Sequence, residues 1–553
     1  MAKSTAIERL MERARARGVE PMLRHFLDPS TSTPDRVRAM ETALRGPAGQ
    51  AVREELGAWI VGLLGVLVPE SYAPWRALVQ DSMLYVVVHL SEARLAPKLV
   101  QQLELPLRAS PERRLMLLIS KVPGLQKLGQ VLARNRELKP SLRRALEKLE
   151  NGVSDVHAEE IRAVIFADLA RELEAYDVVV RRSLMKEASV SAILQFTWRN
   201  PASGRRERGV FKVLKPYIPE FYDEDMKLLQ GLAELLKRNH AKYDVAARGL
   251  SDTFRRVRQL LQHEIKFRGE QSTLAQAQEI YGGVPGVRVP TVFAPLCKRN
   301  ITAISEEHGR KITDAVRRMS PGQRRRVAQK VVETLIGIPL FALNDTTMFH
   351  ADPHAGNLLY DRDTDDLVIL DWALTNRLSI EQRRHVALLS MMVMLRDPVG
   401  VFQEVQALSL QRARRGSRRE RMVRRTIARY LDNLPLAHVP DTMDAMRLLQ
   451  RLAFAGLRLP SSLILLRKSM FTLDGILYDI AGKEVAMDSI LLRHLLWRWV
   501  TSWKALGSPL SLSDWARVQV SLWLSGSRWS LQVAQKAVNT GWRKSALATQ
   551  ATA

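Results

Sequence analysis

The chain has 553 residues, of which 46% are hydrophobic, so it is long enough for two to four domains and too apolar for a disordered protein. Its 84 lysine and arginine residues outnumber 58 aspartate and glutamate residues, and the net charge of +26 favours anionic partners such as phospholipid headgroups, nucleotides or nucleic acid. An arginine-rich proteome would produce the same bias. The single cysteine, Cys297, excludes an internal disulfide and a cysteine-rich metal site, and is compatible with a reducing compartment.

Residues 1–110 are predicted to form an accessory helical region, because Leu and Val recur at spacings of three to four residues. The charged first ten residues lack the apolar core of a signal peptide. The early uncharged run Leu56–Pro69 is shorter than the roughly 18 to 20 residues that span a bilayer, and it indicates a buried helix. Met83–Leu90 fits either a buried helix or a strand. We expect a cytoplasmic location, with peripheral association with the inner membrane as an option, and neither a signal peptide nor a clear transmembrane helix.

Residues 111–185 are expected to form a helical extension. In the segment Lys127-Leu-Gly-Gln130, the lysine and the glutamine are three residues apart and therefore lie on one helix face. Taken alone, such a short match fits an ordinary solvated helix face.

Residues 186–310 have the pattern of a small sheet. A loop of small residues at Glu187–Ala192 precedes a strand, a turn at Asn200–Gly204 and a second strand at Val210–Leu214. A loop of this kind can bring backbone N–H groups close to phosphates. Ile301–Gly309 fits the last strand and a linker.

Lys212 is the strongest feature of this sheet. It stands among Phe, Val and Leu in a strand, and burying an ammonium group without a partner is costly. Nucleotide phosphates or a glutamate on a helix would satisfy it, whereas on an edge strand it would point to solvent. Glu264 and Glu270 follow; six residues apart on one helix, they would point about 120° apart and could not both face Lys212.

Residues 311–435 contain the segment His350-Ala-Asp352-Pro-His-Ala-Gly-Asn357, followed by two strand-like runs around a polar turn and then by Asp371-Trp-Ala. A hairpin of these runs would bring Asn357 and Asp371 close together. Phosphoryl transfer uses one carboxylate to position a nucleophile, and an amide oxygen and a second carboxylate to hold Mg²⁺. The alternatives are loop aspartates in solvent, or a metal-hydrolase cluster of His350, Asp352 and His354.

The segment from His350 to Asn357 resembles the catalytic loop of the ABC1/ADCK/UbiB (AarF) atypical protein-kinase-like family, and the resemblance covers residues 120–375. It implies an α+β, bilobal protein-kinase-like fold, with a small antiparallel sheet lobe, a helical lobe and large N- and C-terminal helical extensions. It also implies ATP and Mg²⁺ as cofactors, and ATPase or restricted phosphotransferase activity linked to membrane lipid and ubiquinone metabolism. The alternative is a catalytically weak, nucleotide-switched pseudokinase that binds lipid or a protein partner.

By this resemblance, Asp352 is the catalytic aspartate, Asn357 and Asp371 hold Mg²⁺, Lys212 holds phosphate, and Glu270 orients Lys212. This chain departs from the kinase motif after Asp371, because it has Asp371-Trp-Ala where kinases have Asp-Phe-Gly, and the missing glycine removes easy access to positive φ.

The resemblance also assigns nucleotide and regulatory roles near the sheet. The small-residue loop is similar to the family's Ala-rich nucleotide loop, with Ala188 and Ser189 at its centre. The family's Lys-x-Gly-Gln helix packs into the nucleotide cleft and restricts access of protein substrates. The corresponding residues are Lys127 and Gln130, with Glu264 as the partner of Lys127. Lys266 departs from the family pattern, which has an aspartate there.

The chain is predicted to be helical from residue 374 to its end, and residues 436–553 form its C-terminal, Trp-rich region. The basic run from Gln411 to Arg429 fits a solvated face, an anionic lipid site or a nucleic-acid site, and the lack of interleaved aromatic residues ranks nucleic acid below lipid. Seven of the 11 tryptophans lie near the C-terminus: Trp497, Trp499, Trp503, Trp515, Trp523, Trp529 and Trp542. They fit an interfacial helix or a bundle packed on the kinase-like lobe. The expected partners are a nucleotide, an anionic or isoprenoid membrane lipid and proteins of a lipid or quinone pathway; nucleic acid is not favoured.

Overall fold

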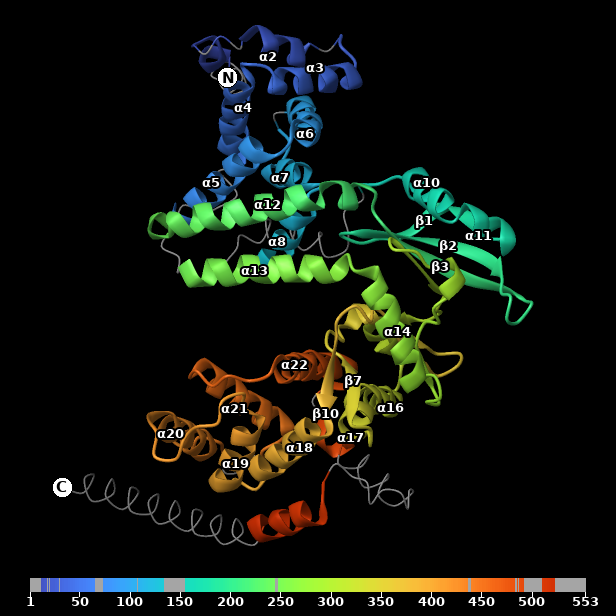
Figure 1. Cartoon of the computed structure of the whole chain (residues 1–553), viewed down its shortest axis with the longest axis vertical. Coiled ribbons are helices and arrows are strands. Elements are labelled where there is room, and N and C mark those ends of the chain that lie inside the picture. Colours follow the sequence, from blue (N-terminus) through green and yellow to red (C-terminus); the bar gives the residue numbers. More distant parts are fainter. Residues whose placement is uncertain are drawn as a thin grey trace, which may run out of the picture. The chain divides into compact units, whose positions relative to one another are not determined.

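The computed structural model describes residues 11–16, 18, 20–28, 30–64, 73–106, 108–133, 155–243, 247–435, 439–482, 485, 487–491 and 510–522. The chain divides into two compact units, which are described one at a time. Unit 1 comprises residues 1–271 and 292–306, and unit 2 comprises residues 272–291 and 307–553. Both units combine helices with a small sheet, so the predicted α+β class is confirmed (Figure 1).

The N-terminal part of unit 1 is helical, as predicted. Its helices are α2 Glu20–Leu27, α3 Thr33–Arg45, α4 Gly49–Leu64, α5 Ala73–His89, α6 Glu92–Glu104, α7 Pro111–Ile119 and α8 Pro123–Ala133. Leu56, Trp59 and Ile60 of α4 are buried, so the first apolar run is a buried helix over its described part. The second apolar run lies in α5, which settles the choice between helix and strand in favour of helix.

Two long helices of unit 1 pack against α8, which lies between them in Figure 1. They are α12 Tyr217–Arg238 and α13 Ala247–Glu264, with the 3-10 turn η3 His240–Tyr243 between them. Leu228, Leu229, Leu232 and Leu236 of α12 join the buried side chains of the N-terminal helices in one apolar core. The extension that carries Lys127 is therefore packed on α12 and α13.

The sheet of unit 1 is antiparallel, in the order β1-β2-β3-β5. Its strands are β1 Val179–Glu187, β2 Ser191–Arg199, β3 Arg206–Leu214 and β5 Ile301–Ser305, with the 3-10 turn η4 Ala294–Leu296 before β5. α10 Ala158–Asp168 packs against β1 and β3, and α11 Ala170–Ala175 follows it. The strand β1 corrects the expected boundary, because the sheet begins before residue 186, inside the range assigned to the helical extension.

Unit 2 contains two small sheets. In the first, the order is β4-β9-β8-β6, with β4 parallel to β9 and the other pairs antiparallel; in the second, β7 pairs with β10. The strands are β4 Val287–Arg288, β6 Arg310–Lys311, β7 Thr346–His350, β8 Leu358–Asp361, β9 Asp366–Ile369 and β10 Thr375–Ser379. The 3-10 turn η7 Ala355–Asn357 links the segment after β7 to β8.

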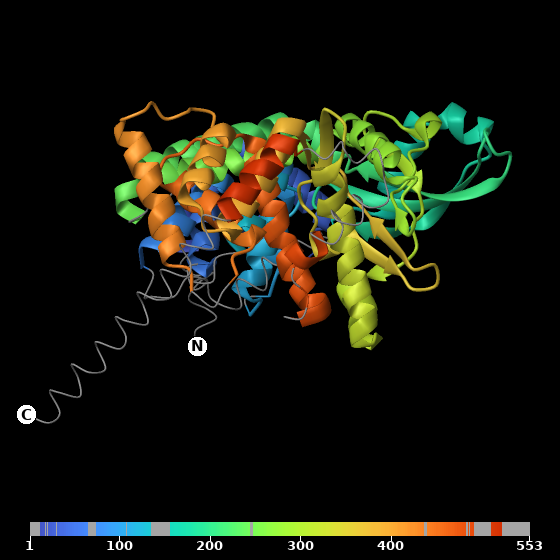
Figure 2. The same cartoon turned by 90° about the horizontal axis from the view of Figure 1, so that it is seen from below.

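The rest of unit 2 is mainly helical (Figures 1 and 2). α14 Phe267–Tyr281 begins in unit 1 and continues into unit 2. The others are α15 Ile312–Ala315, the 3-10 turn η5 Val316–Arg318, α16 Pro321–Val332, the π-helical turn η6 Glu333–Gly337, α17 Ile338–Phe341, α18 Ile380–Met394, α19 Pro398–Leu408, α20 Arg418–Asp432, α21 Thr442–Phe454 and α22 Ser461–Ala481.

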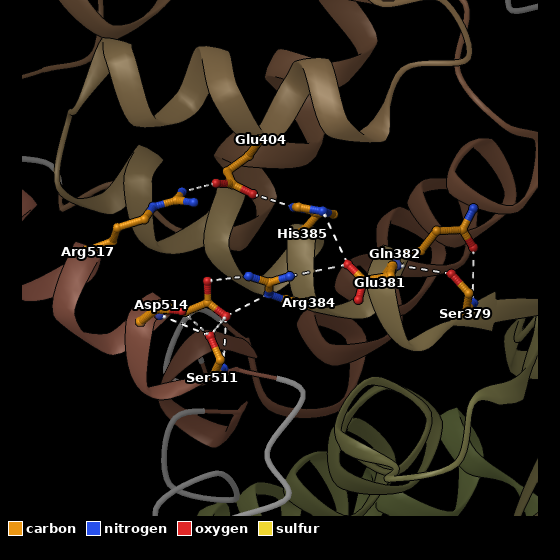
Figure 3. Close-up of polar contacts among 10 residues, drawn as sticks. Ser379, Glu381, Gln382, Arg384, His385, Glu404, Ser511, Asp514 and Arg517 are labelled. Atoms are coloured by element: carbon orange, nitrogen blue, oxygen red, sulfur yellow. Dashed lines mark hydrogen bonds and ion pairs between the residues drawn. The ribbon is translucent and has the colours of Figure 1, made fainter.

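A helical segment at residues 512–522 is attached to α18 and α19 by a polar network (Figure 3). Arg384 of α18 donates two hydrogen bonds to Asp514, at 2.6 and 2.8 Å. Glu404 of α19 contacts both His385 and Arg517. Of the seven C-terminal tryptophans, Trp515 is the one within the described residues, so the prediction on the other six lies outside them. Among the described helices, none is both long and apolar enough to cross a membrane.

Candidate functional site

Lys212 lies on an inner strand of the unit 1 sheet. Its strand, β3, pairs with β2 on one side and β5 on the other, so the edge-strand alternative is wrong. Its ammonium group donates to both carboxylate oxygens of Glu270, at 2.6 and 2.8 Å, and lies 5.4 Å from the ring centroid of Phe267. The Lys212 side chain is 21% exposed and that of Glu270 is 9% exposed, so water screens this pair little while the lysine stays reachable by a ligand.

Glu264 and Glu270 lie on different helices, which corrects the expectation of one continuous helix. α13 ends at Glu264 and α14 begins at Phe267, with the exposed Lys266 in the break. The carboxylate of Glu264 accepts a hydrogen bond from Lys127 of α8 and another from the hydroxyl of Ser189, at 3.3 Å. The structure thus brings Lys127, Glu264 and Ser189 together. Gln130 lies in α8, and its side chain is outside the described part.

The loop of Ala188 and Ser189 closes the hairpin of β1 and β2. The backbone N–H of Ala188 donates to the Ser191 carbonyl at 2.8 Å. A buried ion pair lies beside the loop: Lys215 at the end of β3 is fully buried and donates to Asp155 at 2.6 Å and to Glu187 at 3.3 Å.

Asp155 also connects this ion pair to the extension. It accepts hydrogen bonds from the backbone N–H of Lys121 and the side chain of Gln126, at 3.2 and 3.3 Å. No local pattern in the sequence indicates this cluster around Asp155, because its members are separated by long stretches of chain and match no motif.

In unit 2, the buried His350 fixes the segment that carries Asp352. The ring nitrogen Nδ1 of His350 accepts from the backbone N–H of Asp352 at 3.2 Å, so its Nε2 carries the proton donated to the Leu370 carbonyl at 3.1 Å. Burial lowers the pKa of His350, which favours this neutral form. Both ring nitrogens are therefore engaged inside the protein, which argues against the metal-hydrolase reading. Across the described residues, no group of three His, Cys, Asp or Glu side chains could hold a metal ion.

The predicted hairpin is present and brings Asn357 next to the end of β9. β8 and β9 are antiparallel, with Leu358 opposite Ile369, and the backbone N–H of Leu370 donates to the Asn357 carbonyl at 2.8 Å. The side-chain nitrogen of Asn357 donates to the Asp352 carbonyl at 3.2 Å. This contact uses the amide nitrogen, and the amide oxygen is the atom that ligates Mg²⁺.

Asp371 has a left-handed backbone, with φ of 54°, and its carboxylate accepts from the backbone N–H of Ala373 at 3.3 Å. The next residue, Trp372, is fully buried; its indole donates to the Ile369 carbonyl at 3.1 Å and its own carbonyl accepts from Thr273 at 2.7 Å. The positive φ therefore falls on the aspartate and not on Ala373, so this conformation does not need the glycine of the kinase motif. Aspartate tolerates this region better than most residues, although it remains sparsely populated and marks functional sites.

The side chain of Asp352 has a partner that the sequence analysis missed. Lys468 of α22 donates to its carboxylate at 2.6 Å, and the next residue, the fully buried Ser469, donates to the His350 carbonyl at 3.0 Å. Lys468 stands 116 residues after Asp352, in a helix without a recognisable motif, so no local signal could have found it.

Part of the chain matches known proteins. Residues 148–405 match the model of the ABC1 atypical kinase-like domain. The chloroplastic protein ACTIVITY OF BC1 COMPLEX KINASE 7 of Arabidopsis thaliana is 24% identical over 366 residues, which are 64% of this chain and 50% of that protein. A probable protein kinase UbiB of Xanthomonas axonopodis pv. citri is 25% identical over 363 residues, 64% of each chain. This chain thus spans between half and two thirds of these relatives' lengths.

A solved structure of an Rv3197–erythromycin complex from Mycobacterium tuberculosis aligns over 65% of this chain and 87% of that chain, with a TM-score of 0.42 and 18% identity. The domain match and the named relatives agree with the resemblance of the segment from His350 to Asn357. The predicted family resemblance and the kinase-like, α+β fold class are confirmed. Residues 148–405 form a kinase-like domain that matches the ABC1 atypical kinase-like model.

Proposed function

We propose that this chain binds ATP with Mg²⁺ and acts as an ATPase or a restricted phosphotransferase. The observation that carries the proposal is the backbone hydrogen bond from Leu370 to Asn357 across the hairpin, which brings Asn357 next to the residue that precedes Asp371. An amide oxygen and a carboxylate are ligands that Mg²⁺ accepts when it is bound to nucleotide phosphates.

Each proposed role follows from the chemistry of the side chain. The ammonium group of Lys212 contacts phosphate oxygens, and its bidentate pair with Glu270 fixes its direction. Asp352 accepts the proton of the attacking hydroxyl or water. Asn357 and Asp371 hold Mg²⁺, which neutralises charge on the phosphates when it is bound.

We also propose that the helical extension regulates the nucleotide site. Glu264 is shared by Lys127 of α8 and Ser189 of the proposed nucleotide loop, so α8 and the loop are joined through one carboxylate. Movement of α8 would alter the hydrogen bonding of the loop. Ala188 and Ser189 are proposed to contact the phosphates, and Gln130 to act with Lys127.

A nucleotide-switched pseudokinase is the alternative, favoured by Lys266 and by Asp371-Trp-Ala. Measured turnover separates the two proposals. We expect Mg²⁺-dependent release of phosphate from ATP by the wild type, reduced at least about a hundredfold in Asp352→Asn, because removal of a general base costs 10²–10⁴-fold. Asp363→Asn, an exposed residue in the turn of the hairpin, is the matched control and should keep its rate. ATP binding without any turnover in the wild type would favour the pseudokinase.

We further propose that the protein acts at an anionic membrane surface. Nine arginines between residues 412 and 429 are exposed, against the single glutamate Glu420: Arg412, Arg414, Arg415, Arg418, Arg419, Arg421, Arg424, Arg425 and Arg429. Two apolar side chains belong to neighbouring segments, since the backbone N–H of Leu410 bonds the Arg458 carbonyl at 3.0 Å and Phe454 ends α21. Leu410 is 64% exposed and Phe454 is 82% exposed. Basic residues with protruding apolar side chains suit a bilayer with anionic headgroups.

Vesicle binding tests the membrane proposal. Arg414→Glu with Arg415→Glu should weaken binding to vesicles that contain anionic lipid at least about tenfold, since each cation near such a surface contributes about 1 kcal/mol. Arg181→Glu with Arg182→Glu removes the same charge from exposed positions on β1 and should have little effect. Equal losses in both variants would contradict a specific membrane-binding surface. Tight binding to nucleic acid at the same salt concentration would favour nucleic acid over lipid as the anionic partner.

The UbiB name of the Xanthomonas relatives supports a role in ubiquinone or lipid metabolism, with an isoprenoid lipid or proteins of that pathway as partners. Cells that lack this chain should contain less quinone, and the wild type should restore the quinone content while Asp352→Asn does not. An unchanged quinone content would contradict a role in ubiquinone metabolism.

A further inference from the structure

Lys468 lies next to the carboxylate of Asp352. Its ammonium group is 2.6 Å from the Asp352 carboxylate, and the two side chains are 32% and 36% exposed. A group that binds at the open side of this carboxylate therefore comes within reach of the lysine. An ammonium group has three N–H donors, and within the described residues the structure gives this one a hydrogen bond to Asp352.

The position of Lys468 is set by its helix. Ser469 is fully buried and bonds the His350 carbonyl at 3.0 Å, and Leu466, Met470 and Leu473 of α22 are buried. The lysine is thus presented by a packed helix that is fixed to the catalytic segment. An ion pair in which both side chains are about a third exposed contributes little to stability, so the pair is poorly explained as a structural support.

The catalytic segment supplies no cation of its own. Residues 351–357 contain no lysine or arginine, and Nδ1 of His354 accepts from the backbone N–H of Gly356 at 3.1 Å. In phosphoryl transfer, negative charge spreads over the oxygens of the transferred group, and nearby cations stabilise it.

We propose that Lys468 contacts the terminal phosphate of ATP and stabilises its transfer, a role that rests on the proposed function. The bond between the terminal phosphorus and the bridging oxygen breaks, and ADP leaves with the electron pair. A new bond forms from water or a hydroxyl oxygen to phosphorus, and the proton of that nucleophile passes to Asp352. Lys468 keeps its proton throughout, bridging Asp352 and the phosphate oxygens.

The test compares Mg²⁺-ATP with Mg²⁺-ADP, because only ATP carries the terminal phosphate. Lys468→Met should weaken ATP binding about tenfold, the effect of losing one charge-assisted hydrogen bond, and should leave ADP binding unchanged. Lys468→Arg should retain most of the preference for ATP. Lys330→Met is the matched control, since Lys330 of α16 pairs with Asp365 in the turn between β8 and β9 at 2.9 Å, and its removal should leave both affinities unchanged.

The outcomes separate this inference from the proposed function. If the wild type binds both nucleotides and Lys468→Met weakens both equally, or neither, the contact with the terminal phosphate is wrong while nucleotide binding stands. If the wild type binds neither nucleotide, the proposed function falls and this inference with it. Melting temperatures measured without nucleotide show whether Lys468→Met is folded; if it is not, the ratio of ATP to ADP affinity in Lys468→Arg decides.

Discussion

Lys212 and Glu270 illustrate how a single residue can be identified from its surroundings. A lysine in an apolar strand requires an anionic partner, and the structure supplies a glutamate at 2.6 Å that is 9% exposed. Removing either partner leaves a poorly hydrated charge, which is more costly than removing both.

A double-mutant cycle measures this coupling. Lys212→Met and Glu270→Gln should each lower the free energy of unfolding of unit 1 by about 1–3 kcal/mol, and the double variant should lose at least about 1 kcal/mol less than the sum. Denaturant unfolding of the four proteins gives the values. Additive losses would mean that the two side chains do not interact.

At the scale of elements, the clearest attachment is that of residues 512–522 to α18 (Figure 3). Asp514 is 1% exposed and accepts hydrogen bonds from Arg384 and from the backbone N–H and hydroxyl of Ser511. The segment buries this carboxylate while Leu512, Val520 and Leu522 are 80%, 59% and 51% exposed. A charged residue therefore forms the attachment, and apolar side chains face outward, which is the reverse of an ordinary amphipathic helix.

Asp514→Asn should weaken this attachment at neutral pH by about 2 kcal/mol, because it leaves Arg384 without its bidentate partner. Hydrogen exchange of the backbone amides at 512–522 should speed up in this variant, while Asp479→Asn, at an exposed position on α22, should not change it.

The pH dependence of this attachment in the wild type has a defined sign. Burial opposes ionisation, but hydrogen bonds from Arg384 and Ser511 outweigh it and lower the pKa of Asp514 to about 2, from an ordinary value of 3.8. Since the folded pKa is below the unfolded one, the carboxylate stabilises fully above about pH 4 and progressively less as the pH falls toward 2. The difference in exchange between wild type and Asp514→Asn should shrink over that interval. A difference that stays constant over this interval would contradict the link between the ionisation of Asp514 and the attachment.

At the scale of the whole molecule, the features that the sequence predicted are those encoded locally. The hairpin of β8 and β9, the strand of Lys212 and the helical N-terminal region each follow from patterns within about ten to twenty residues. β1 was missed because its exposed Arg181, Arg182 and Lys186 hide the alternation of a strand. The pairing of Lys468 with Asp352 and the cluster around Asp155 depend on contacts between distant segments, which no local pattern records.

Thermal unfolding with nucleotide tests whether Lys212, Asp352, Asn357 and Asp371 serve one ATP. ATP at a hundredfold excess over its Kd should stabilise the wild type by about 2.7 kcal/mol, seen as a higher melting temperature, and chelation of Mg²⁺ should remove most of that shift. Asp371→Asn should melt at the wild-type temperature without nucleotide and show no Mg²⁺-dependent shift, while Asp363→Asn should behave as the wild type. This account would be contradicted if ATP left the melting temperature of the wild type unchanged, or if the Asp371→Asn variant kept the full Mg²⁺-dependent shift.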